Sequence, residues 1–151
     1  MFKKFTKFVM LMAFAVMASV SCEKVQPDTP EELQLEVNAN NISGRWALVL
    51  LDGQELLEGT FLHMEFIRNE KKFIITDGMQ GFGDAPKTFD GRFDFEYDLS
   101  LGTILIGMYD HDSGLWNDKY IVESLTETTL QLKGVKSGTV QIFSKMKTEE
   151  K

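Results

Sequence analysis

The sequence predicts an all-β domain, an up-and-down antiparallel meander that closes into a barrel of about eight strands. From Gly44 onward, short apolar or alternating segments are separated by Gly, Asp, Asn and Ser. None of these segments keeps a helical period beyond two turns. The connections are short enough for antiparallel hairpins, whereas parallel strands need crossovers of a dozen or more residues. Closure into a barrel removes the two free edges that an open meander would expose.

Strands are expected where apolar residues alternate with polar ones between turn residues. The expected strands are, in order, 45–51, 60–68, 72–76, 87–90, 92–98, 103–109, 119–125, 128–133 and 139–147. The strictest alternation lies in the fifth, where Phe93, Phe95 and Tyr97 alternate with charged residues. We therefore expect one face of this strand to be buried and the other to be wet.

Two loops are expected to border the barrel. Residues 52–58, between the first two strands, have room for one helical turn that would cover a barrel mouth, with Leu56 and Leu57 facing inward. The long glycine-rich loop after the third strand carries Met79 and Phe82. This loop is expected to be a mobile gate over the mouth, because glycines lower the cost of rearrangement, and the alternative is a plain long turn whose Phe82 folds back on the barrel.

The first 21 residues are predicted to be a secretory signal peptide rather than part of the domain. Three lysines within the first seven residues precede an apolar run at 8–18 and small residues at 19–21. The run is shorter than the roughly 20 residues that cross a bilayer. Residues 22–42, which hold two prolines and several acidic residues, are expected to form a flexible tether. Within it, 33–37 is expected to be unordered, with a short edge strand as the alternative.

The sequence Ser19-Val20-Ser21-Cys22 resembles the lipobox of bacterial lipoproteins, although the usual Leu is replaced by Ser19. The resemblance implies that Cys22 is lipidated and becomes the first residue of the mature chain. It also implies export and anchoring in the cell envelope, in the outer membrane on its periplasmic or surface face. The presence of only one Cys agrees, because a thioether leaves no free thiol in an oxidising compartment. Ordinary cleavage near Ala18, with Cys22 left free, is the alternative.

Gly44-Arg45-Trp46 at the start of the first strand resembles the Gly-x-Trp of lipocalins and related calycin barrels. The segments 119–133 and 140–145 are similar to the ending of small lipocalin-like domains of bacterial lipoproteins. The resemblance implies a barrel over 43–147, followed by a tail at 148–151, with Trp46 closing one end. Many lipocalins place an Arg over this Trp, and here Lys145 or Lys147 would substitute. A β-sandwich with Trp46 as a core residue is the alternative.

The expected function is the binding of a small apolar or amphipathic molecule in the barrel or at its mouth. The candidate contact residues are the large aromatic ones, namely Trp46, Phe61, Phe66, Phe93, Phe95, Tyr97 and Trp116. The plain alternative for the aromatic residues is core packing, because the interior of a small eight-stranded barrel is just wide enough to be filled by side chains. The alternative function is a non-catalytic interaction module, in which a filled barrel docks another envelope protein. Glycan binding or hydrolysis is a third alternative.

No motif supports an enzyme, a cofactor or a metal site. His63 and His111 are the only imidazoles and lack zinc-ligand spacing. His63 and Glu65 share a strand face and are the one candidate acid–base pair, with a salt bridge or exposure as the alternative. The acidic loop at 110–118 fails the EF-hand pattern, although an irregular Ca²⁺ site stays open. The net charge of −7, with no basic cluster after the first seven residues, argues against nucleic acid.

Overall fold

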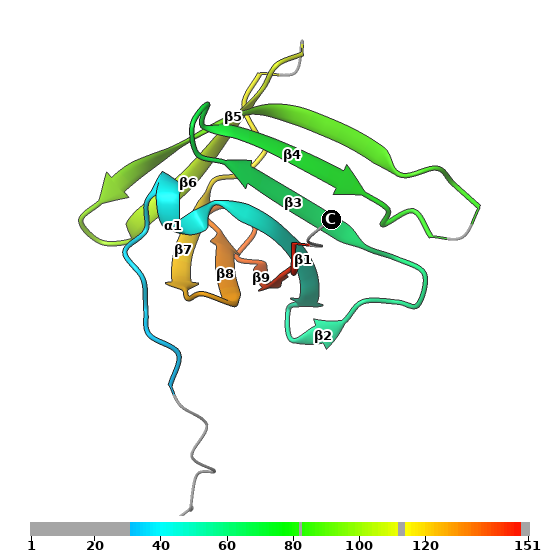
Figure 1. The fold of residues 1–151 in the computed structure, drawn as a ribbon, viewed down its shortest axis with the longest axis horizontal. Coiled ribbons are helices and arrows are strands. Elements are labelled where there is room, and N and C mark those ends of the chain that lie inside the picture. Colours follow the sequence, from blue (N-terminus) through cyan, green and yellow to red (C-terminus); the bar gives the residue numbers. More distant parts are fainter. Residues whose placement is uncertain (1–30, 82, 112–113, 149–151) are drawn as a thin grey trace, which may run out of the picture. The chain divides into compact units, whose positions relative to one another are not determined.

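The computed structural model describes residues 31–81, 83–111 and 114–148. The expected signal peptide, Cys22, the first part of the tether, Phe82 and part of the acidic loop lie outside the described residues. The described residues from 32 onward form one compact unit. The described elements are the helical turn α1 (Ala39–Ile42) and the strands β1 (Gly44–Leu51), β2 (Gln54–Glu55), β3 (Leu62–Ile67), β4 (Lys72–Asp77), β5 (Lys87–Asp98), β6 (Gly102–Tyr109), β7 (Tyr120–Leu125), β8 (Thr129–Gly134) and β9 (Val140–Lys145) (Figure 1).

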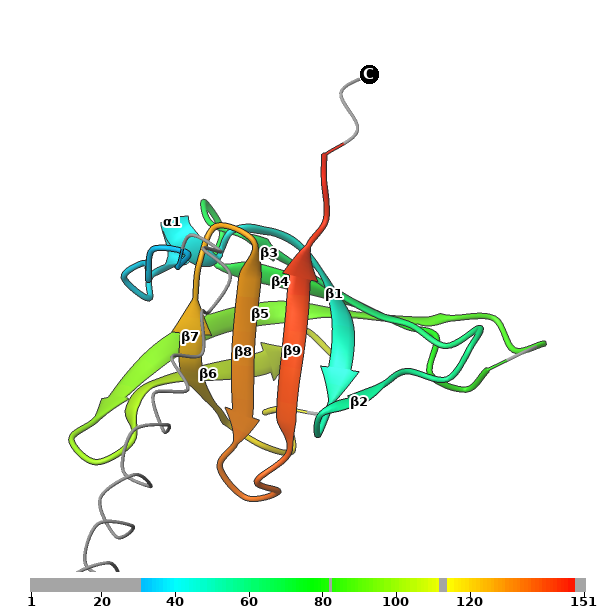
Figure 2. The ribbon, with the colours of Figure 1, turned by 90° about the horizontal axis from the view of Figure 1, so that it is seen from below.

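The strands form a closed antiparallel barrel, as the sequence predicts. Each strand from β3 to β9 pairs with the next along the chain, and β1 pairs with both β3 and β9. Figure 2 shows β8, β9 and β1 side by side where the ring closes. The short strand β2 pairs only with the end of β1, so eight strands make the barrel. Closure leaves no long free edge for another chain to extend.

The strand predicted to break near Gly91 is continuous in the structure. Gly91 pairs with Phe73 on β4 and with Tyr109 on β6, so β5 runs through the position at which we expected a turn. A Cβ atom built on Gly91 would lie 2.0 Å from the carbonyl oxygen of Met108. The glycine is therefore present because the neighbouring backbone comes so close, and it does not end the strand.

The segment expected to form a helical lid is a hairpin instead. Asp52 and Gly53 have φ angles of 50° and 77°, the left-handed conformation that both central residues of a type I′ turn require. This turn joins β1 to β2. Leu56 packs against the core, but Leu57 is 79% exposed, so the expected inward position of Leu57 is wrong.

The packed domain begins at about residue 32, earlier than the residue 43 expected from the sequence. The carboxylate of Glu32 accepts hydrogen bonds from the hydroxyls of Thr126 and Thr128 in the turn between β7 and β8. The backbone N–H of Leu35 donates to the carbonyl of Leu125 at 2.8 Å. Residues 33–37 thus lie against the barrel without forming a strand, and the expectation of an unordered segment is wrong for them.

Trp46 fills the end of the barrel beneath α1. Its side chain is fully buried, and the indole N–H donates to the carbonyl oxygen of Ile42 at 2.8 Å. The ammonium of Lys145 lies 5.0 Å from the centre of the Trp46 ring, within cation–π range. Of the two lysines that the resemblance offered for the position over this Trp, Lys145 is the one that the structure places there. This end of the barrel is closed by side chains.

Candidate functional site: a pocket in the open mouth

A pocket of about 160 Å³ lies inside the barrel and extends from Met64, the partner of Trp46 in the β1–β3 ladder, toward the other end. Its position follows from its lining, which comes from the beginnings of β3, β7 and β9 and the ends of β6 and β8, whereas Trp46 is near the start of β1. Apolar side chains line one part of it, namely Leu62, Met64, Ile75 and Leu132. Aromatic and amide side chains line the rest, namely Tyr109, Trp116, Asn117, Tyr120 and Gln141. A pocket of this composition suits a molecule with an apolar body and a polar end.

The pocket is small because large side chains fill the rest of the barrel. Phe66, Phe73, Phe93 and Phe143 are all essentially buried in one core cluster with Trp46. Drug-sized ligands occupy pockets of about 300–1,000 Å³. A cavity of about 150 Å³ is enough to hold benzene. The barrel therefore has room for a compact molecule or for one end of a longer one.

Of the seven aromatic residues proposed to contact a ligand, the structure places Trp116 in the wall of the pocket. Trp46, Phe66 and Phe93 belong to the buried core, as in the alternative of plain core packing. Phe95 is only partly buried, at the edge of the same cluster.

The remaining predicted residues lie away from the pocket. Tyr97 is 75% exposed, so the buried face of β5 ends before it and its expected burial is wrong. Phe61 stands on the opposite face from Met64 and Phe66, and its ring packs beside His63 with centroids 4.9 Å apart. Met79, in the expected gate loop, is half-buried and does not line the pocket.

The sequence does not predict the apolar wall of the pocket. Leu62 and Met64 lie on one face of a strand, and no pattern distinguishes them from other inward residues. Ile75 and Leu132 also sit on strands in inward positions. Strand periodicity identifies which residues face inward, and it contains no information on which of them border an empty space.

Trp116 reaches the barrel interior because the loop before β7 pairs with β6. Its backbone N–H donates to the carbonyl of Gly107 at 2.9 Å, and the N–H of Tyr109 donates to the carbonyl of Gly114 at 2.8 Å. The indole lies directly on Gly107, where a Cβ atom would come within 2.0 Å of the ring. Its centroid is 4.9 Å from that of Phe73, in an edge-to-face arrangement. Trp116 thus closes one side of the mouth.

The two phenols of the pocket remain protonated at neutral pH. Burial raises the pKa of Tyr109 above its ordinary value of 10.0. Burial also raises the pKa of Tyr120, and the negative charge of Asp118 adds to the effect. Both phenols are therefore available to donate and accept hydrogen bonds, while the pocket itself stays uncharged.

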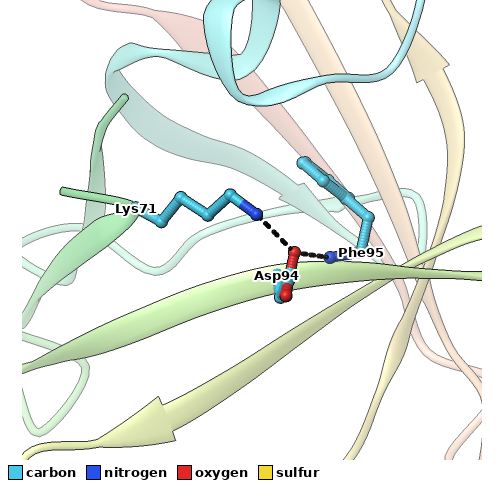
Figure 3. A network of polar contacts seen from close by, with 3 residues as sticks. All are labelled: Lys71, Asp94 and Phe95. Carbon is cyan, nitrogen blue, oxygen red and sulfur yellow. Dashed lines mark hydrogen bonds and ion pairs between the residues drawn. The ribbon is translucent and has the colours of Figure 1, made fainter. Parts of the chain in front are cut away.

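A polar network on the outer surface fixes the strand that follows Phe93. The ammonium of Lys71 contacts Asp94 at 2.9 Å, and the same carboxylate oxygen accepts the backbone N–H of Phe95 at 3.0 Å (Figure 3). The hydrogen bond from Lys71, followed by that from Phe95, lowers the pKa of Asp94. The pair is well exposed, so it contributes little stability and serves mainly to hold the turn before β4 over β5.

The proposed acid–base pair is on the outside of the barrel. His63 and Glu65 are both half-exposed on β3, with Met64 between them pointing inward. Burial and then the positive charge of Arg45 lower the pKa of His63, so its imidazole is neutral at neutral pH. Neither residue lines the mouth pocket.

Within the described residues, no three His, Cys, Asp or Glu side chains gather as metal ligands would. In the acidic loop, Asp118 turns its carboxylate to backbone N–H groups of Lys136 and Ser137, while Asp112 lies outside the described residues. The helix found in the described part of the chain is not long and apolar enough to cross a bilayer.

Comparison with known proteins identifies a structure of similar fold but no matching family. No protein-family model matches the sequence, and no curated protein sequence does. A solved structure that matches is the NMR structure of a protein from Bacteroides uniformis, with a TM-score of 0.52 and 12% sequence identity. The match covers 74% of this chain and 94% of that chain. At this identity, the likeness shows a shared barrel fold alone.

Proposed function

We propose that this protein is a non-catalytic, lipocalin-like binding protein that holds a small apolar or amphipathic molecule in the mouth of its barrel. The observation that carries the proposal is the 160 Å³ pocket, apolar on one side and bordered by phenol, indole and amide groups on the other. Its titratable lining groups are two phenols that stay protonated, which suits binding better than acid–base chemistry.

The binding domain would be held in the cell envelope by a lipid on Cys22. The lipobox-like Ser19-Val20-Ser21-Cys22 and the signal-peptide pattern before it support this part of the proposal. The test is to replace Cys22 with Ser and to fractionate the cells. We expect the variant to leave the membrane fraction, and a variant that stays there would refute the lipid anchor.

The pocket is tested by a titration with benzyl alcohol, an aromatic molecule of suitable size with one hydroxyl. The methyl NMR signals of Met64, Ile75 and Leu132 should shift together and give one dissociation constant. Signals of Val49, which is exposed on β1, should not move. Absence of any shift at the three pocket methyls, up to the solubility of the alcohol, would refute small-molecule binding and favour the docking module considered from the sequence.

A pair of variants on neighbouring positions of β4 supplies the control. Ile75→Phe places extra atoms in the pocket and should abolish the shifts at Met64 and Leu132. Ile74→Phe adds the same atoms on the other face of the strand, because successive side chains point to opposite sides. We expect this second variant to bind benzyl alcohol as the unaltered protein does.

A further inference from the structure

The indole of Trp116 separates two pockets. On one side is the mouth pocket, and on the other is a groove of about 360 Å³ on the outside of the barrel. Trp116 and Asn117 line both of them. The groove has an apolar floor that includes Ile106, Leu115 and Val135, and the latter two side chains are exposed.

The direct pairing of β6 with β7 is short near Trp116. β6 and β7 pair at only two positions, Ile104 with Ile121 and Leu105 with Tyr120, whereas β5 and β6 pair at eight. Beyond Leu105, β6 bonds instead to the loop that carries Trp116. The β6–β7 ladder is interrupted after Leu105 and pairing resumes at Met108 with Leu115, and the Trp116 indole lies against Gly107 at this interruption.

The Trp116 indole carries a buried polar group in this conformation. Trp116 is only 9% exposed, yet its buried Nε1–H has no hydrogen-bond partner among the described residues. A buried donor without a partner raises the free energy of the conformation that contains it. A rotation of the indole that exposed this N–H to water or to a ligand oxygen would remove that penalty.

A cation stands at the rim of the outer groove. The ammonium of Lys136 donates to the carbonyl oxygen of Asn117 at 3.3 Å and, within the described part of the chain, makes no ion pair with a carboxylate. By contrast, Lys119 on the same groove is already paired with Glu96 at 2.7 Å. Lys136 is therefore the lysine of this groove that is available to an anionic group.

We propose that the mouth pocket and the outer groove are two halves of one site for a single-chain carboxylate amphipath of about ten carbons. This inference rests on the proposed function and specifies its ligand. About six carbons of the chain fill the inner pocket, which has the volume that holds benzene. The rest of the chain displaces the Trp116 indole and lies over Leu115 and Val135. The carboxylate then pairs with Lys136.

The test is a titration with decanoate, monitored by NMR. We expect the methyl signals of Ile75 inside, those of Leu115 and Val135 outside, and the indole N–H signal of Trp116 to report one dissociation constant. The indole N–H of Trp46, bonded to a carbonyl at the closed end, is the internal control and should not move. Shifts confined to one of the two pockets would overturn the joined site.

The role of the ligand's carboxylate charge is tested separately from that of its alkyl chain. Lys136→Gln should weaken decanoate binding at least about fivefold and leave the binding of 1-decanol, which has no charge, unchanged. Lys87→Gln, on an exposed lysine at the start of β5, should alter neither. Equal decanoate affinity in Lys136→Gln and the unaltered protein would overturn the carboxylate assignment. Benzyl alcohol binding without decanoate binding would overturn this inference alone, whereas loss of both would overturn the proposed function as well.

Discussion

Asp118 ties the loop that carries Trp116 to the turn between β8 and β9, and its replacement should destabilise the barrel. One carboxylate oxygen accepts the backbone N–H groups of Lys119 at 2.8 Å and Lys136 at 2.9 Å. The other accepts the N–H and the hydroxyl of Ser137 at 3.0 and 2.9 Å. Hydrogen bonds to a charged group contribute about 1.5–3 kcal/mol when they are buried, and less where water can replace them, as at this turn.

We therefore expect Asp118→Ala to lower the free energy of unfolding by about 2 kcal/mol, less than the sum of four buried bonds. Asp118→Asn should cost about half as much, because the amide keeps one acceptor oxygen. Urea denaturation at pH 7, followed by circular dichroism, measures both. Asp84→Ala, on an exposed aspartate in another loop, is the control and should change little. A loss below about 0.5 kcal/mol for Asp118→Ala would refute this reasoning.

The same carboxylate makes stability depend on pH in the acid range. Burial acts to raise the pKa of Asp118, but the hydrogen bonds from Lys136, Ser137 and Lys119 outweigh it, so the pKa lies below its ordinary 3.8. The folded protein therefore favours the charged form. Its contribution is complete above about pH 4 and is lost as the pH falls through the lower pKa of the folded state. Asp118→Asn should flatten this part of the urea–pH curve, and a curve parallel to that of the unaltered protein would contradict the assignment.

Three further changes test other contacts. Gly107→Ala should cost about 1–3 kcal/mol and shift the Trp116 indole signal, because the new Cβ would lie 2.0 Å from the ring; unchanged melting and spectra would contradict the packing. The pKa of His63 is lowered by burial and by Arg45, so stability should fall as the pH drops below 6.5. His63→Gln should remove that slope in urea titrations between pH 7.5 and 5, and a retained slope would count against it. Trp46→Ala should lose about 3–5 kcal/mol in the same assay, and a loss near 1 kcal/mol would show that the closed end is not a packed plug.

Alternation and short connections predict most of the barrel strands. The wrong predictions fall where a local pattern fits two different structures, or where a contact joins segments distant in the sequence. The sequence around Gly91 predicts a turn, but a glycine is required at this position because the backbone of β6 lies so close to it. Asp52-Gly53 is a strong hairpin signal, yet the leucines after it suggested a helical lid. The docking of Glu32 depends on hydroxyls more than ninety residues away, which no local pattern can reveal.

The candidate site was predictable only in part. Trp116 was singled out as a large aromatic residue in a loop, and it does border the pocket. Its neighbours Ile75 and Leu132 look in sequence like any other inward strand residues. Whether an inward residue meets a packed core or a vacant space depends on the sizes of the side chains opposite it, from strands distant in sequence. That information appears only when the ring of strands is assembled.

The contact of residues 32–35 with the β7–β8 turn joins the start of the described chain to one end of the barrel. Because Glu32 and Leu35 are bonded to the end of β7 and the turn after it, the first described residues are fixed at the end of the barrel that Trp46 fills. The pocket is lined mainly by other strand segments, so a molecule bound there would not displace the contacts of residues 32–35.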